Sequence, residues 1–178
     1  MKKIRLLNNV QGYTLVEALM TTLIMAVILG AILMILLSGS ESWQVNSAQV
    51  EANQEVRKAM EWMKQELIQG GSSTITNVPA DGTWYPTITF KTASGVSGGV
   101  ITWSSNTIQY LRGGTNSQQL LRRSGGVDKV IAIDMQALQF RRQSSSANVV
   151  EINVQAQKDT PRGTHLTASA NFQVKLRN

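Results

Sequence analysis

The sequence predicts an α+β protein in which one long amino-terminal helix packs against a carboxy-terminal antiparallel β-sheet domain. Two observations predict this fold class. Residues 13–69 are compatible with one helix, first apolar and then amphipathic, whereas residues 71–178 hold all three prolines and ten of the fourteen glycines. Because proline and glycine interrupt helices and mark turns, the second region is typical of short strands joined by turns.

The amino-terminal segment carries an apolar run at residues 18–37, ALMTTLIMAVILGAILMILL, without a charged side chain. At about 1.5 Å per residue, a helix of this length spans roughly 30 Å, the thickness of the hydrocarbon core of a bilayer. Lys2, Lys3 and Arg5 precede the run, and the nearest charge after it is Glu41. The positive-inside rule therefore predicts a single pass through the cytoplasmic (inner) membrane, N-in and C-out.

Different interpretations of this segment compete. A cleaved secretory signal would use Ser38-Gly39-Ser40 as its processing site, but its apolar region is normally about 7–15 residues long, shorter than this run. A plain uncleaved anchor leaves Glu17 without a role. A carboxylate within a spanning helix costs up to about 2.5–3.5 kcal/mol at full depth, so its presence needs a reason.

A hexapeptide supplies the third interpretation. Gly12-Tyr13-Thr14-Leu15-Val16-Glu17 lies between the short basic leader and the apolar run. It resembles the class III signal of type IV prepilins and pseudopilins, with Tyr13 at a position where that family usually has Phe. The resemblance implies that residues 1–12 are a leader, that prepilin peptidase cuts after Gly12, and that the new amino group of Tyr13 is N-methylated.

The same resemblance gives Glu17 a role in assembly. In a filament of side-by-side apolar helices, Glu17 of one subunit would neutralise the Tyr13 ammonium of its neighbour, since two buried charges are tolerable only as a pair. A subunit one helical turn out of place would leave both charges unpaired, so the pair would fix the stacking position. The competing interpretation is an interfacial carboxylate that snorkels to lipid headgroups.

The helix is expected to continue beyond the membrane. Residues 41–69 contain no proline or glycine, and their apolar residues recur at three- and four-residue spacing, which makes one stripe along a helix. Gly70-Gly71-Ser72-Ser73 is expected to end it. The stripe consists of Val45, Ala48, Ala52, Val56, Ala59, Met60, Met63 and Leu67. The predicted organisation is 1–12 cleaved leader, 13–40 membrane and filament-core helix, 41–70 amphipathic continuation and 71–178 β-rich periplasmic or extracellular domain.

Strand signals fill the last 108 residues. The clearest are period-two alternations at residues 150–156 and 166–176, which predict half-buried strands. Residues 83–92 and 118–123 are also expected as strands. A further hairpin is expected between residues 100–103 and 107–112, with Ser104-Ser105-Asn106 as its turn. The resulting sheet, or pair of sheets, should pack on the apolar stripe of the helix.

Composition disfavours most enzyme chemistry. The chain has no cysteine and one histidine, His165, which removes thiol catalysis, cysteine-bound metals and His-based triads, and no dense carboxylate loop for calcium is present. We therefore expect a non-enzyme without cofactor or metal. Removing Lys2, Lys3 and Arg5 from the 17 basic side chains leaves 14 against 11 acidic ones, so a general nucleic-acid binder is not favoured. The pairs Arg122-Arg123 and Arg141-Arg142 are expected at solvated strand edges.

A weaker resemblance extends further along the chain. Residues 54–60 (QEVRKAM), 65–67 (QEL), 138–140 (LQF) and 174–178 (VKLRN) are similar to the J-type pseudopilins of type II secretion and the W-type minor pilins of type IV pili. The resemblance implies a minor subunit near the filament tip or priming assembly. Its partners would be other pilin-like subunits, prepilin peptidase and the inner-membrane assembly platform. The alternative is a tip binding module, an adhesin or a DNA-uptake receptor for competence, which would gather arginines or aromatics such as Trp84, Tyr85, Trp103 and Tyr110 on one face.

Overall fold

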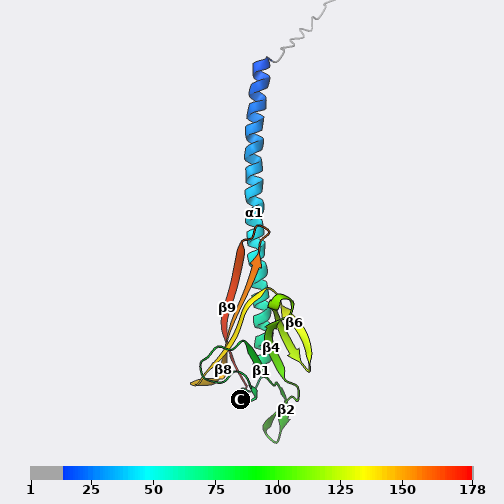
Figure 1. Cartoon of the computed structure of the whole chain (residues 1–178), viewed down its shortest axis with the longest axis vertical. Helices are drawn as coiled ribbons and strands as arrows, with labels where there is room; N and C mark the ends of the chain where they lie inside the picture. The colour runs from blue at the N-terminus through cyan, green and yellow to red at the C-terminus, as the bar shows by residue number, and fades with distance from the viewer. Residues whose placement is uncertain (1–13, 178) are drawn as a thin grey trace, which may run out of the picture. The chain divides into compact units, whose positions relative to one another are not determined.

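A computed structural model describes residues 14–177, and Figure 1 gives its elements. The chain divides into two compact units with the boundary between Trp43 and Gln44. Helix α1 (Leu15–Leu67, 53 residues) contributes its first part to one unit and its second part to the other. The prediction of one continuous helix from residue 13 to residue 69 is confirmed to within two residues at the carboxy-terminal end, and Tyr13 lies outside the described residues.

The end of α1 explains the two glycines that follow it. The N–H groups of Gln69 and Gly70 donate to the carbonyls of Glu66 and Leu67 at 3.0 and 2.9 Å, which tightens the last turn. Neither Gly70 nor Gly71 has a positive φ. A Cβ atom on Gly71 would instead lie 2.4 Å from the Trp103 ring. Close packing, and not backbone handedness, therefore requires glycine there.

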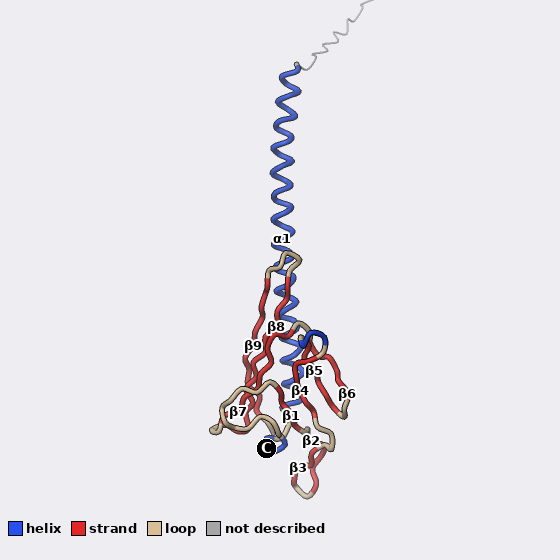
Figure 2. Tube along the Cα trace, viewed as in Figure 1, coloured by secondary structure: helices blue, strands red, loops and turns tan. Residues whose placement is uncertain are grey.

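The second unit contains three antiparallel sheets, drawn as red strands in Figure 2. The four-stranded sheet has the order β1-β4-β5-β6, the three-stranded sheet has the order β7-β8-β9, and β2 pairs with β3. A bridge between Tyr85 and Phe140 links the segment before β1 to β7. The strands are β1 (Thr87–Phe90), β2 (Ala93–Ser97), β3 (Val100–Trp103), β4 (Ile108–Gly113), β5 (Gln119–Ser124), β6 (Val127–Ala132), β7 (Met135–Gln143), β8 (Ser146–Asp159) and β9 (His165–Lys175), with short 3-10 turns at Ser72–Thr74 and Thr115–Ser117.

One predicted hairpin is wrong. β3 pairs with β2 and not with β4, which lies between β1 and β5. The turn of the β2–β3 hairpin is Gly98-Gly99, with φ values of 59° and 82°. Two consecutive positive φ values are what a two-residue hairpin turn of matching twist needs, and glycine supplies them without steric cost. Ser104-Ser105-Asn106 instead carries the chain from the small sheet to the four-stranded one.

The alternating strands are confirmed. In β8, Val150, Ile152, Val154 and Ala156 are buried, and the residues between them are half-buried. The predicted strand at residues 83–92 is shorter than expected, since β1 begins only after Pro86. Proline lacks the N–H group that a ladder requires, which accounts for the late start.

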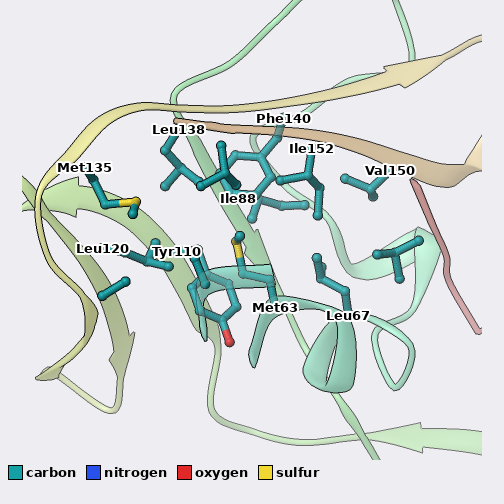
Figure 3. Packing of buried hydrophobic residues seen from close by; sticks show 14 of the residues in the cluster. Met63, Leu67, Ile88, Tyr110, Leu120, Met135, Leu138, Phe140, Val150 and Ile152 are labelled. Carbon is teal, nitrogen blue, oxygen red and sulfur yellow. The ribbon is translucent and has the colours of Figure 1, made fainter. Parts of the chain in front are cut away.

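The core lies between the second part of α1 and the sheets. The helix contributes Ala52, Val56, Ala59, Met63 and Leu67, which belong to one continuous apolar cluster with the inward residues of the strands. Figure 3 shows Met63 and Leu67 among residues of both larger sheets. The predicted stripe is therefore a packing surface. The alanines in it keep side-chain bulk low where the helix approaches the sheets.

Candidate assembly segment

The processing residues lie outside the described part of the chain. Gly12 and Tyr13 precede residue 14, where the description begins, so cleavage and methylation there remain predictions. Glu17, the last residue of the motif, is described. It is exposed and occupies the first turn of α1.

Local hydrogen bonds begin the helix at this motif. The carbonyl of Thr14 accepts from the N–H groups of Glu17 and Ala18, each at 3.1 Å. The Thr14 hydroxyl oxygen also accepts from the Glu17 N–H at 3.3 Å. Thr-x-x-Glu is the capping-box spacing, and an acidic side chain is favourable beside the positive end of the helix dipole. Thr14 thus caps the backbone N–H of Glu17, a contact that the sequence analysis missed although the Thr-x-x-Glu spacing indicated it.

The first part of α1 is apolar on every side. Its most apolar window has a mean hydropathy of 2.7, and none of that window is buried, so this one described helix is long and apolar enough to cross a membrane. A helix that is apolar all round requires an apolar environment, either lipid or other helices. The exposed large side chains are Leu15, Val16, Leu19, Met20, Leu23, Ile24, Met25, Val27, Ile28, Leu29, Ile32, Leu33, Met34, Ile35, Leu36 and Leu37.

The polar groups within the apolar run are satisfied by the helix itself. The Thr21 hydroxyl donates to the Glu17 and Ala18 carbonyls at 3.0 and 2.9 Å, and the Thr22 hydroxyl donates to the Leu19 carbonyl at 2.9 Å. Because no water is available in a hydrocarbon core, hydroxyls there need internal acceptors of this kind. These two threonines are therefore compatible with a membrane or a bundle of apolar helices.

The four adjacent arginines are all engaged. Arg122 donates to Glu66 on α1, Arg123 pairs with Asp128, and Arg141 pairs with Glu151. Arg142 is buried and donates to the Ala147 and Val78 carbonyls at 2.7 and 3.2 Å, and burial lowers its pKa. The members of each pair point to opposite faces, as expected for a strand. The expectation of solvated edges is wrong for Arg142, whose guanidinium replaces solvent with backbone acceptors.

The aromatic side chains do not gather on one exposed face. Tyr110 is fully buried, and its hydroxyl donates to Glu66 at 2.6 Å; burial and this bond raise its pKa. Trp84, Tyr85 and Trp103 are half-buried, and the Arg141 guanidinium covers the Trp84 ring at 4.4 Å from its centre. The arginine and aromatic surface that a DNA receptor or adhesin was expected to present is therefore not formed by these residues.

Several other titratable groups form small clusters, and Lys158 pairs with both Glu51 and Asp134. His165 is exposed at the start of β9, and its Nδ1 lies 2.7 Å from Asp159 Oδ1, an interaction that lowers the pKa of Asp159. Hydrogen bonds from Tyr85 and Arg123 likewise lower the pKa values of Asp81 and Asp128. Within residues 14–177, no three His, Cys, Asp or Glu side chains converge in a way that could hold a metal ion.

Comparison of the chain with protein-family models, curated proteins and solved structures gave no match. Function must therefore be inferred from the residues themselves. The features available are the apolar part of α1 with its single carboxylate and the β-sheet domain that packs on the amphipathic part.

Proposed function

We propose that the chain is a minor pilin or pseudopilin, a non-enzymatic structural subunit of a type IV pilus-like filament that acts near the tip or in priming assembly. The observation that carries the proposal is the segment of α1 up to residue 37, which exposes apolar side chains on all sides and holds one carboxylate, Glu17, in its first turn. The amphipathic second part of the same helix, packed against antiparallel sheets, is the other feature in favour.

Membrane insertion tolerates this carboxylate. The run at residues 18–37 contains eleven Leu, Ile and Val side chains. At about 0.3–0.6 kcal/mol each they favour insertion by roughly 3–7 kcal/mol, against a cost of up to about 2.5–3.5 kcal/mol for a carboxylate at full depth and less near the interface. Insertion of the subunit into the cytoplasmic membrane before assembly is therefore energetically favourable.

Moving the helix from lipid into a filament exchanges one apolar environment for another. Apolar burial changes little in such a transfer, so close packing and polar pairs decide which arrangement forms. After cleavage by prepilin peptidase, the protonated amino group of Tyr13 would be such a polar partner. Pairing with Glu17 of the adjacent subunit removes two uncompensated charges at once and fixes the axial position of the incoming subunit.

The capping interaction allows a sharp test of this pairing. A capping box accepts Gln in place of Glu at the third helical position, whereas an ion pair does not. In cells that assemble the filament, Glu17→Gln should leave the membrane-inserted amount unchanged and lower the filament-incorporated fraction at least about ten-fold, the equivalent of one lost charge interaction of about 1.4 kcal/mol. Glu61→Gln, at an exposed position of the same helix, is the matched control. Wild-type incorporation of Glu17→Gln would refute the pairing.

The partners in this proposal are other pilin-like subunits, prepilin peptidase and the inner-membrane assembly platform. The basic residues Lys2, Lys3 and Arg5 favour a cytoplasmic amino terminus, with the β-sheet domain on the outer side in this proposal. After extraction the subunit would belong to a periplasmic or cell-surface filament. The arginines and aromatics that a tip receptor was expected to gather on one face are instead engaged within the domain.

A further inference from the structure

The outward face of the three-stranded sheet is rich in uncharged amides. Cross-strand pairing aligns Gln139, Asn153 and Asn171 in one row, and the row beside it contains Gln155 opposite Ser169. The inward positions of β8, such as Ile152 and Val154, are apolar and buried. We call the following residues the amide face: Gln139 on β7, Asn153, Gln155 and Gln157 on β8, and Asn171 and Gln173 on β9.

Such a composition is not explained by sheet formation. Asn is depleted in strands, and a solvated face usually carries interspersed charges or threonine. The four-stranded sheet of the same domain shows the usual mixture, since one outward row across it contains Thr89, Gln109, Arg123 and Asp128. The concentration of amides therefore belongs to one sheet of the domain and not to the chain as a whole.

The formal charges on this face balance, with Arg141 and Lys175 against Glu151 and Asp159. Arg141 on β7 and Glu151 on β8 form an ion pair at one end, and Asp159 and His165 interact at the other. A polyanion would find no concentration of positive charge here, which disfavours phosphate backbones as ligands. The face also lacks the exposed aromatic core that is typical of protein–protein interfaces.

The amides have hydrogen-bonding capacity to spare. Across residues 14–177, the side chains of Gln155 and Asn171 have no hydrogen-bond partner, and Asn153 has only a 3.5 Å contact with Gln139. Each amide offers both donors and acceptors, which is the pattern that alcohol hydroxyls can match from either side. Side chains on one face repeat about every 6.6–6.8 Å along a strand and about 4.8 Å between strands. A ligand with regularly repeated hydroxyls can therefore engage several amides at once.

A shallow hollow lies at the Glu151 end of the face. It has a volume of about 120 Å³ and is lined by Gln143, Ser146, Val149, Glu151 and Gln173. Gln143 and Gln173 donate to Glu151 Oε1 at 3.1 and 3.4 Å, and Arg141 Nε donates to Oε2 at 2.9 Å. These hydrogen bonds hold the carboxylate in place among the side-chain amides that line the hollow.

We propose that the amide face binds a neutral, linear polysaccharide, with the Glu151 hollow receiving the hydroxyls of one sugar unit. Neutral charge, paired donors and acceptors, and a repeating two-dimensional spacing favour this ligand over a nucleic acid or an apolar protein surface. The proposal concerns the domain surface alone. It does not depend on processing at Gly12 or on the pairing of Glu17.

The test is affinity electrophoresis of the full chain in a detergent without a sugar headgroup. Native gels contain amylose, dextran or hydroxyethylcellulose as neutral probes, and alginate or DNA as polyanionic probes. We expect retardation by at least one neutral polymer and none by the polyanions. The variant Asn153→Thr/Gln155→Thr/Asn171→Thr should weaken binding ten-fold or more, since one lost hydrogen bond lowers affinity by roughly 2- to 10-fold.

Gln109→Thr, on the outward face of the four-stranded sheet, is the matched control and should bind as wild type. Threonine favours strands, so the melting temperature of the triple variant should not fall. Failure of all three neutral polymers to retard the chain overturns the proposal. Equal retardation of wild type and triple variant, or retardation by alginate or DNA alone, also overturns it. Filament incorporation of the triple variant should match wild type, which separates this result from the outcome for Glu17→Gln.

Discussion

Glu66 connects the helix to the four-stranded sheet, and its removal gives a prediction with a calculable size. Its carboxylate accepts from the Tyr110 hydroxyl at 2.6 Å and from Arg122 Nε at 2.7 and 2.9 Å. Tyr110 is fully buried, whereas 22% of the Arg122 side chain and 19% of the Glu66 side chain are exposed. Glu66→Ala therefore leaves a buried hydroxyl without its charged acceptor, while the guanidinium can recruit water.

The expected loss of unfolding free energy combines the hydrogen bond from Tyr110 and the ion pair with Arg122. A hydrogen bond to a charged group contributes about 1.5–3 kcal/mol, and a partly exposed ion pair contributes up to about 1 kcal/mol. Glu66→Ala should lower the free energy of unfolding by about 2–4 kcal/mol. Glu66→Gln keeps an acceptor for Tyr110 and should cost less, about 1–2 kcal/mol.

Urea unfolding of the full chain in micelles, followed by tryptophan fluorescence, measures the effect. Glu61→Ala, at an exposed position five residues earlier on α1, is the control and should change the free energy of unfolding by less than about 0.5 kcal/mol. If Glu66→Ala is no more destabilising than Glu61→Ala, the carboxylate does not link the helix to the sheet as described.

Other predictions use the same unfolding assay. Met63→Ala should cost about 2–4 kcal/mol, because Met63 is fully buried, and an equal effect of Ile68→Ala, at an exposed position just after α1, would contradict the burial of Met63 in the core. Gly71→Val should cost about 1–3 kcal/mol through its clash with the Trp103 ring, whereas a neutral result would contradict the close approach. The pKa of Asp159 is lowered by His165, so the stability that the pair adds is present above the ordinary carboxyl pKa of 3.8 and is lost as pH falls through the lower folded-state value. Melting temperature should therefore drop between about pH 5 and pH 3, and Asp159→Asn should make that drop smaller.

The sequence predicted the regular elements best where periodicity was strong. The apolar stripe from Ala48 to Leu67 identified the buried side of the helix, because a 3.6-residue period leaves little freedom in which side is covered. Period-two alternation identified β8 and β9 for the same kind of reason. A periodic pattern of apolar residues indicates both the type of element and which of its sides is buried.

Strand pairing was less predictable. The strand at residues 100–103 pairs with the preceding strand, β2, through the turn Gly98-Gly99. Composition alone did not distinguish this turn from the expected one at Ser104-Ser105-Asn106. The glycine pair was the stronger signal, since two positive φ values favour it over serine. The Glu66–Arg122–Tyr110 contact was not foreseeable, because it joins residues up to 56 positions apart.

The structure describes only part of the candidate assembly segment. Glu17 lies in the first turn of α1 as expected from the motif, whereas the Thr14 cap on its backbone N–H was not foreseen. The amide face became visible only when the register placed residues of three strands in rows, since along the chain the same residues alternate with apolar ones.

The central claim is that the chain is processed as a pilin-like subunit before it enters a filament. Intact-mass measurement of the protein extracted from membranes tests it most directly. Processing predicts a mature chain that begins at Tyr13 and carries one added methyl group. A functional chain that retains Met1, or one that begins at Glu41 after cleavage behind Ser40, would contradict it.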